Sequence, residues 1–350
     1  MRRATFAVFV LLVFLSLLSC GGEIVVLSYN VENLFDDRDE GREYPEYSGE
    51  KWSEAAYRQK LTAVARALKA ASSRGADILC LQEIESEVAL RDLRDRHLKN
   101  LGYRHLVFVP QAGAATGVAY LSRLPILRSR AHEVGSFDGV PLRRILEIQV
   151  EHRGSVLYLF NNHWKSKSGG VERTAAARRQ AARVLTSRVR AILDSFPEAD
   201  VLVVGDLNEN LEDFEAAGGR YATATAAYRP AESHDELPDA LFITSVPVQA
   251  GVRQERVVLY DPWYEIAAEQ RGSSAYQGRW QTPDRILLSA GLFDREGFFC
   301  KPGDFAVVRK RFLIDPQSGF PRRWRPGAAG EAAGTSDHLP LRLTVRLALP

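Results

Sequence analysis

The sequence has little cysteine and, after its first twenty residues, no long hydrophobic run. Three cysteines in 350 residues cannot support a disulfide scaffold, and no Cys/His spacing of a zinc site is present. Hydrophobic residues make up 45% and charged residues 26% of the chain, which excludes a disordered chain and a coiled coil. A chain of this length buries a core large enough to fold without cross-links. Cys80 and Cys300 lie in apolar segments, where packing is more usual than pairing, and a disulfide between them stays open.

The one long apolar run lies at the N-terminus and is short for a membrane span. Two arginines precede an apolar stretch over residues 6–18, shorter than the ~20 residues of a transmembrane helix and typical of a signal peptide. The run ends at Cys20 as a bacterial lipobox does, although Leu18 departs from the residue usual there. We predict a lipoprotein-type signal peptide over residues 1–19, lipidation of Cys20, and export to a membrane, at its periplasmic face or the cell surface. A plain secretory signal and an uncleaved anchor are the alternatives.

The charge balance gives no general attraction to nucleic acid. The chain has 46 Lys and Arg against 44 Asp and Glu, and the predicted signal peptide carries two of the arginines, so the mature chain is formally neutral. Any binding of phosphate groups must therefore be local. One candidate is the segment 301–326, where seven basic residues stand against two acidic ones, interleaved with aromatic residues. Such a segment suits a groove that binds a phosphate backbone and stacks bases; anionic lipid headgroups and an ordinary solvated hairpin are the alternatives.

Apolar runs that predict strands recur from end to end, while helical patterns occupy only some of the connections. Helices are predicted over 53–71, 87–99 and 172–195. Strands are predicted over 24–29, 77–81, 103–109, 118–121, 145–150, 156–160, 201–204, 286–288 and 341–345. This pattern is neither a strict βαβ alternation nor all-β, and it favours two mixed sheets packed together with helices outside. No repeat or linker marks a boundary, so we expect one domain over residues 23–350.

Polar residues follow several of the predicted strands at the point where each strand ends. Each cluster alone has an ordinary explanation as a turn or cap. Together they hold carboxylates, amides and histidines at strand ends, where side chains can converge on one rim of a sheet. The clusters are Asn30 to Asn33, Gln82-Glu83, His163 to Lys167, Gly205 to Asn208, Asp284, and Ser336-Asp337-His338.

These motifs, in this order, resemble those of the endonuclease/exonuclease/phosphatase superfamily. Pancreatic deoxyribonuclease, apurinic endonucleases, neutral sphingomyelinases and inositol-phosphate phosphatases belong to it. The resemblance spans residues 24–346 and implies a four-layer α/β/β/α sandwich of two mixed sheets flanked by helices. It also implies a metal-dependent phosphoric ester hydrolase.

The resemblance implies a role for most of the strand-end residues. Hard divalent cations prefer oxygen ligands, and the implied ligands are Asn30, Glu83 and Asp337. Asp206 would orient or deprotonate the attacking water, and Asn208 would hold that water or the phosphate. His338 would contact a phosphate oxygen, with Asp284 fixing its tautomer. The implied cofactor is Mg²⁺, with Mn²⁺ or Ca²⁺ as alternatives.

His163 divides the superfamily. Pancreatic deoxyribonuclease and the sphingomyelinases have a histidine there, as a general acid or phosphate contact, and apurinic endonucleases do not. The surrounding His-Trp-Lys-Ser-Lys sequence resembles secreted bacterial nucleases, in which Lys165 would point at a phosphate. Arg144 is a further candidate substrate contact, with an ordinary surface role as its alternative, and Glu32 matches a second acidic residue near the metal.

We therefore expect an exported, lipid-anchored, monomeric phosphodiesterase whose substrate is nucleic acid. A sphingomyelinase-like or phosphoinositide or small-phosphoester hydrolase, acting on a phospholipid headgroup, is the main alternative. A non-catalytic surface binding module is the second alternative, which the presence of the whole metal-and-water constellation disfavours. Whether the substrate is DNA or RNA, and the cleavage endo- or exonucleolytic, stays open.

Overall fold

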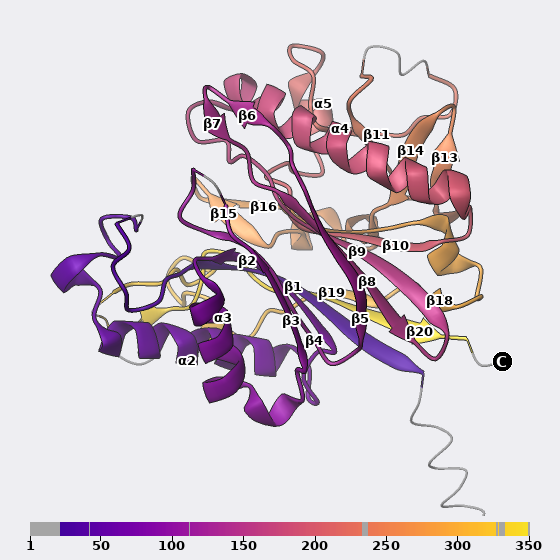
Figure 1. The fold of residues 1–350 in the computed structure, drawn as a ribbon. Helices are drawn as coiled ribbons and strands as arrows, with labels where there is room; N and C mark the ends of the chain where they lie inside the picture. The colour runs from indigo at the N-terminus through magenta and orange to yellow at the C-terminus, as the bar shows by residue number, and fades with distance from the viewer. Residues whose placement is uncertain are drawn as a thin grey trace, which may run out of the picture.

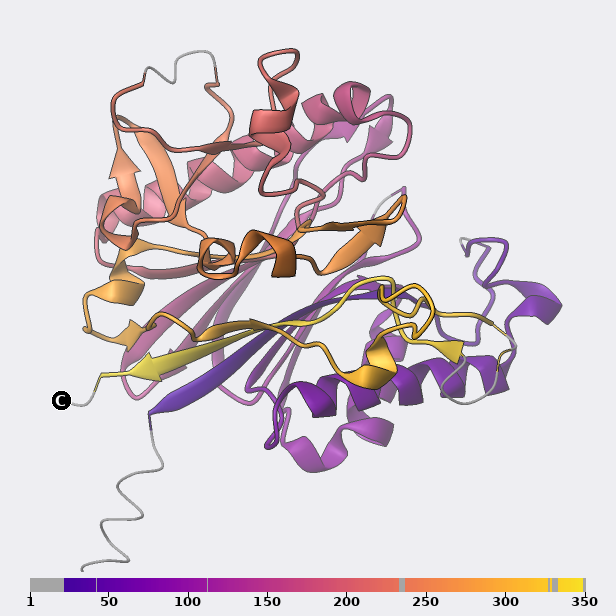
Figure 2. The same cartoon turned by 180° about the vertical axis from the view of Figure 1, so that it is seen from behind.

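Two mixed β-sheets packed face to face form the centre of the molecule, and helices cover their outer faces (Figures 1 and 2). The computed structural model describes residues 22–348 except 42, 112, 233–236, 327 and 329–332. The predicted signal peptide and Cys20 lie outside the described residues. Among the helices that are described, none is long and apolar enough to cross a membrane.

The first sheet runs in the order β18-β20-β1-β2-β4-β3, with β19 beside β20. Its strands are β1 (Glu23–Leu34), β2 (Ile78–Ile84), β3 (His105–Val109), β4 (Gly117–Ser122), β18 (Phe298–Phe299), β19 (Phe305–Val307) and β20 (Leu341–Leu347). Two small hairpins lie outside the sheets, formed by β6 (Ser136–Phe137) with β7 (Val140–Pro141) and by β15 (Ser274–Tyr276) with β16 (Arg279–Gln281).

The second sheet runs in the order β11-β12-β14-β17-β10-β9-β8-β5, with β13 beside β14. Its strands are β5 (Ile126–His132), β8 (Ile145–His152), β9 (Ser155–His163), β10 (Asp200–Asp206), β11 (Thr225–Ala227), β12 (Leu241–Thr244), β13 (Gly251–Arg253), β14 (Arg256–Tyr260) and β17 (Asp284–Leu288).

Helices complete the outer layers. α2 (Glu54–Ala71) and α3 (Glu87–Asp92) cover the first sheet, and the long α4 (Val171–Ser195) covers the second, with the short α5 (Asp213–Ala217) near its end (Figure 1). A π-helical turn, Leu93–His97, continues α3. Single 3-10 turns occupy Gly49–Lys51, Lys99–Leu101, Pro247–Gln249, Pro262–Glu265, Ala268–Gln270, Ala290–Phe293 and Arg311–Leu313.

The hydrophobic core has two main parts. One lies between the two sheets and beneath α4, and the other lies between the first sheet and α2 and α3. In α2 the Ser53 hydroxyl accepts the Ala56 N–H at 3.2 Å and caps the helix, while Leu61, Val64 and Leu68 are buried along one stripe. Cys80 and Cys300 are both buried and unpaired, so no disulfide joins them.

The predicted four-layer sandwich is confirmed. The helix predicted around 87–99 is present, but its second half is a π-helical turn, in which the Leu98 N–H bonds Leu93 O at 3.1 Å. Strand β5 escaped prediction because it is a sheet-edge strand whose residues are mostly exposed and polar, so it lacks the apolar run of the buried strands.

Candidate active site

Three neighbouring strands of the second sheet bring three polar side chains to one level. β9 and β10 are parallel and place His163 opposite Asp206, while β10 and β17 are antiparallel and place Asp206 opposite Asp284. Directly opposite residues point to the same face of a sheet. All three side chains are buried. The strand-end clusters predicted from the sequence at these positions therefore do converge.

The first sheet contributes through irregular strand ends. β1 and β2 stay in register as far as Asn30 opposite Gln82, and the register then shifts. Glu32, Asn33 and Glu83 beyond that point have φ of 53°, 58° and 64°, a left-handed conformation uncommon outside glycine. Such bulges redirect side chains and concentrate beside active sites. Here the carboxylate of Glu83 is held by the Asn33 N–H at 2.9 Å.

Asn30 joins the two sheets at the site. Its Nδ2 donates to Glu83 Oε1 at 3.0 Å and to Asp206 Oδ2 at 3.1 Å. The Nε2 of His163 lies 3.7 Å from each of the same two carboxylate oxygens. The residues predicted as metal ligand, water-orienting acid and phosphate contact thus share one small space between the sheets.

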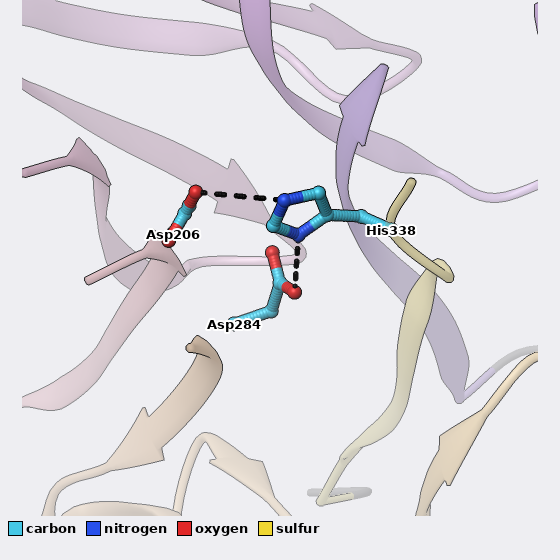
Figure 3. A group of neighbouring side chains, drawn as sticks. All are labelled: Asp206, Asp284 and His338. Carbon is cyan, nitrogen blue, oxygen red and sulfur yellow. Dashed lines mark hydrogen bonds and ion pairs between the residues drawn. The ribbon is translucent and has the colours of Figure 1, made fainter. Parts of the chain in front are cut away.

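His338 closes the site from the loop before β20, and Figure 3 shows its ring between Asp206 and Asp284. Its Nδ1 donates to Asp284 Oδ2 at 2.8 Å, and the Ser273 hydroxyl donates to the same oxygen at 2.5 Å. Its Nε2 lies 3.9 Å from Asp206 Oδ2 and 3.9 Å from Asp337 Oδ1. The predicted role of Asp284 as the orienting partner of His338 has the geometry it requires.

The two site histidines differ in charge. Burial lowers the pKa of His163 well below its ordinary value, and the charges of Arg143 and His338 lower it further. Burial also disfavours charge on His338, but Asp284, Asp337 and Asp206 outweigh it and hold the pKa of His338 well above its ordinary value. His338 is therefore the proton-bearing group at neutral pH, and His163 is a neutral imidazole whose buried Nδ1 has no partner among the described residues.

Asp206 stands at the centre of these contacts. Burial, together with the charges of Asp284 and Glu83, raises its pKa to about 6, although the charge of His338 opposes the rise. Its Oδ1 accepts the Asn208 N–H at 2.9 Å, which fixes the carboxylate. A carboxylate whose pKa lies near neutrality is suited to taking a proton from water.

Asp337 faces an arginine as well as His338. Arg323 Nη2 lies 3.4 Å from Asp337 Oδ2, and Arg323 Nε donates to Glu32 Oε1 at 2.8 Å. The other oxygen of Glu32 accepts the Trp324 N–H at 2.8 Å. Glu32, predicted to lie near the metal, thus uses both oxygens to hold the segment 320–325. Lys60 is fully buried nearby and donates to Thr335 O at 2.7 Å.

The predicted phosphate-binding residues lie at different distances from the centre. Asn208 is adjacent, with its Nδ2 donating to Trp164 O at 3.1 Å. The Lys165 ammonium lies 3.4 Å from Ser166 O and has no contact with the site carboxylates among the described residues. Burial, together with Arg143 and Arg178, lowers the pKa of Lys165.

Arg144 points away from the centre. Its Nε pairs with Glu133 at 2.7 Å, and the carboxylate of Glu133 is 71% exposed. Its neighbour Arg143 is the arginine whose charge acts on His163 and Lys165. A substrate contact by Arg144 stays a prediction.

Three further residues take part in the site in roles that had not been predicted. Ser273 fixes Asp284, Ser336 donates from its Oγ to Asn30 O at 2.7 Å, and Arg323 reaches Asp337. Ser336 had a sequence signal, because it lies in the motif that carries Asp337 and His338. Ser273 had none of its own, since it reaches the site through a loop, and Arg323 had been considered only as part of the basic segment 301–326.

The oxygen-rich donor set fits a hard divalent cation. Glu83, Asp206 and Asp337 offer carboxylate oxygens, and Asn30 offers an amide oxygen that already accepts the Glu32 N–H at 3.0 Å. Ligand atoms of Asp206, Asp284 and His338 also lie within 4.8 Å of one another and could hold an ion. The chemistry of the site therefore agrees with the predicted metal requirement.

Residues 25–227 match the profile of the Endonuclease/Exonuclease/phosphatase family. The chain belongs to this family. Together with the convergent carboxylates and histidines, membership supports a metal-dependent phosphodiesterase. No curated protein matches the sequence.

Several solved structures share the family fold. Truncated TDP2 of Caenorhabditis elegans is 16% identical with a TM-score of 0.54, covering 93% of this chain and 98% of that one. D. rerio TDP2 complexed with single strand DNA product is 14% identical with a TM-score of 0.51, covering 92% and 98%. SmcL is 14% identical with a TM-score of 0.51, covering 93% and 99%. At these identities the likeness shows the fold alone.

Proposed function

We propose that the protein is an exported, lipid-anchored nuclease that hydrolyses nucleic-acid phosphodiester bonds with a metal-assisted water. The observation that carries the proposal is the meeting of Glu83, Asp206 and His163 around the Asn30 amide, with distances of 3.0 to 3.7 Å. Opposite them stands the protonated His338 with its orienting partner Asp284. This arrangement supplies groups for water activation and for a charged phosphate.

The cation is assigned to Glu83, with Asn30 beside it and Asp337 close by. When bound, Mg²⁺ would neutralise charge that develops on the phosphate oxygens; Mn²⁺ or Ca²⁺ could serve the same donors. Asp284 is assigned to orienting His338 and not to the cation, because its Oδ2 already accepts hydrogen bonds from His338 and Ser273. This division favours the predicted ligand set over one built on Asp284 and His338.

The remaining residues handle the water and the proton. Asp206 orients the attacking water and takes its proton, in keeping with its raised pKa. Asn208 holds the water or the phosphate beside it. The imidazolium of His338 donates to a phosphate oxygen from Nε2, while Nδ1 stays bound to Asp284. His163 supplies a neutral contact to the phosphate from the opposite side.

Nucleic acid is the preferred substrate for two reasons. The His-Trp-Lys-Ser-Lys sequence around His163 is similar to secreted bacterial nucleases. In addition, one structure that shares the fold, D. rerio TDP2, holds a single strand DNA product. Export and lipidation at Cys20 rest on the N-terminal sequence, and they would place the nuclease outside the cytoplasm.

Nicking of supercoiled plasmid by the purified protein tests the proposal. We expect nicking with Mg²⁺, none with EDTA, and at least a hundredfold loss in His163→Ala. Arg128→Ala, which changes an exposed residue on β5, is the matched control and should nick normally. An intact plasmid, with turnover of sphingomyelin or a phosphoinositide instead, would move the assignment to a phospholipid headgroup.

A further inference from the structure

A groove of about 640 Å³ opens beside the catalytic centre. It lies between the β15–β16 hairpin and the segment 315–325; Figure 2 shows the orange hairpin beside the yellow chain that leads to β20. We call it the basic groove. Its lining includes Ala275, Phe320, Arg322, Arg323, Arg325 and Asp337. The volume is in the range of pockets that enclose a sizeable ligand.

Arginines outnumber acidic residues in the lining of the basic groove, although Arg322 Nη2 donates to Ile314 O at 3.1 Å and Arg323 is paired with Glu32 and Asp337. Three arginines line it against the carboxylates of Asp315 and Asp337. Asp315 is committed to its own turn, since its Oδ1 accepts the N–H groups of Gln317 and Ser318 at 3.0 and 2.9 Å. Arg325 is exposed, and its side chain has no bonding partner among the described residues. An anionic ligand is the chemistry that this lining favours.

The basic groove ends at the catalytic centre. Asp337 belongs to both, and Arg323 connects them through its 3.4 Å contact with Asp337. Glu32 fixes this segment through Arg323 Nε and the Trp324 N–H. Gly334 packs so closely that an added Cβ would lie 1.9 Å from Arg323 O. The groove wall is therefore held in place by contacts with the site itself.

Aromatic side chains accompany the charge. Phe320 lines the basic groove and packs edge-on against Trp280 at 5.3 Å between ring centroids. The guanidinium of Arg309 covers Trp280 at 4.3 Å. Tyr276 at the end of β15 is 63% exposed, a large value for an aromatic residue beside a groove. Bases of a single strand stack on such side chains without sequence preference.

The basic segment predicted over 301–326 is thus divided by the fold. Only its final part, from 315 onward, lines the basic groove. Trp324 packs inside the molecule against Trp52, with the Lys60 ammonium 5.1 Å from its ring. Phe312 lies under Arg66 at 3.9 Å. These two aromatic residues support the structure and are not available to bases.

We infer that the basic groove binds the single strand that flanks the scissile phosphodiester bond, with Arg322, Arg323 and Arg325 contacting successive phosphates and Phe320 contacting a base. The inference rests on the proposed nuclease function and adds to it the site for the rest of the strand. The interleaving of aromatic and basic side chains favours a nucleic-acid strand over a lipid headgroup.

Fluorescence anisotropy with fluorescein-labelled dT12, in EDTA to prevent cleavage, tests the inference. Arg325→Glu should weaken dT12 binding at least tenfold at low salt. The slope of log K against log salt concentration should be less steep by about 0.7, because one phosphate contact is lost. Arg128→Glu changes the net charge equally and lies far along the edge strand β5, so its Kd should change less than twofold. Arg322→Gln, measured in the same assay, should also weaken the binding of dT12.

The outcomes separate this inference from the proposed function. Wild-type protein that nicks plasmid, with Arg325→Glu binding dT12 as the wild type does, overturns the groove and leaves the nuclease standing. Wild-type protein that binds dT12 in the predicted way but does not cut supports the groove and overturns the nuclease. Loss of binding to phosphatidylglycerol vesicles in Arg325→Glu, with dT12 binding intact, overturns the inference in favour of a lipid surface.

Discussion

At the scale of single residues, Asp206 carries most of the site. Its carboxylate accepts hydrogen bonds from the Asn30 amide of the other sheet and from the Asn208 N–H. It also faces both site histidines. Burial disfavours the ionised form of Asp206. The fold therefore keeps a carboxylate at a position where an uncharged side chain would be more stable. Costs of this kind at a cleft are characteristic of functional residues.

Asp206→Asn should lower kcat by about a thousandfold, because the amide cannot accept the proton of the water. The thermal midpoint should stay the same or rise, since the substitution removes a buried charge. The measurement pairs plasmid-nicking rates with thermal unfolding. Asp194→Asn, at an exposed ion pair of α4, is the control. Near-full activity in Asp206→Asn would refute the assigned role.

Lys165→Ala should raise KM about tenfold and change kcat little. The ammonium group lies away from the site carboxylates and would contact a non-bridging oxygen of a substrate phosphate. Loss of one charge-assisted hydrogen bond, about 1.5 kcal/mol, corresponds to that factor. Lys167→Ala is the control, since Lys167 is already bound to Asp213. Steady-state kinetics on an oligonucleotide decide it, and an unchanged KM would remove Lys165 from the substrate site.

At the scale of elements, Glu147 on β8 ties the second sheet to α4. Its carboxylate accepts Arg188 Nε and Nη2 at 2.8 Å each, and His132 Nε2 of β5 lies at 2.7 Å. Burial alone would raise the pKa of Glu147, but the hydrogen bonds from Arg188 and His132 outweigh it and lower the pKa to about 2. The contact therefore stabilises the fold only while the carboxylate is ionised.

Glu147→Gln should lower the free energy of unfolding by about 3 kcal/mol at pH 7. The folded-state pKa lies below the unfolded one, so this stabilisation is fully present above about pH 5 and is lost as the pH falls toward 2. Urea unfolding of both proteins from pH 7 to pH 3.5 measures it. The difference should narrow with acid. Glu151→Gln, on the same strand, should show no such trend; a constant difference for Glu147→Gln would contradict the ion-pair explanation.

The sequence allowed prediction of the buried strands and of the strand ends at which the site residues lie, because both depend on local patterns. Apolar runs marked β1, β2, β9 and β10, and the polar residues after them marked where each strand ends. What could not be predicted depends on register and long-range packing. Nothing local indicates that the charge of Arg143 acts on His163, or that Glu32 pairs with Arg323.

At the scale of the whole molecule, attraction to phosphate is confined to one place. With 46 Lys and Arg against 44 Asp and Glu the chain has no strong general field, and the basic groove supplies a local one that leads to Asp337. Neutrality elsewhere would limit adsorption to unrelated polyanions. A protein anchored by its N-terminus would keep such a site available to substrates that diffuse past, which makes the anchor the next feature to test.

Cys20→Ser should release the protein from the membrane fraction and leave plasmid nicking unchanged. Each buried CH₂ of an acyl chain contributes about 0.8 kcal/mol to membrane binding. Position 20 lies outside the described residues, whose first strand, β1, begins at Glu23. Cell fractionation with labelling by a palmitate analogue measures both location and acylation. Wild-type protein that is unlabelled and soluble would show a plain secretory signal, and a membrane-bound Cys20→Ser would show an uncleaved anchor.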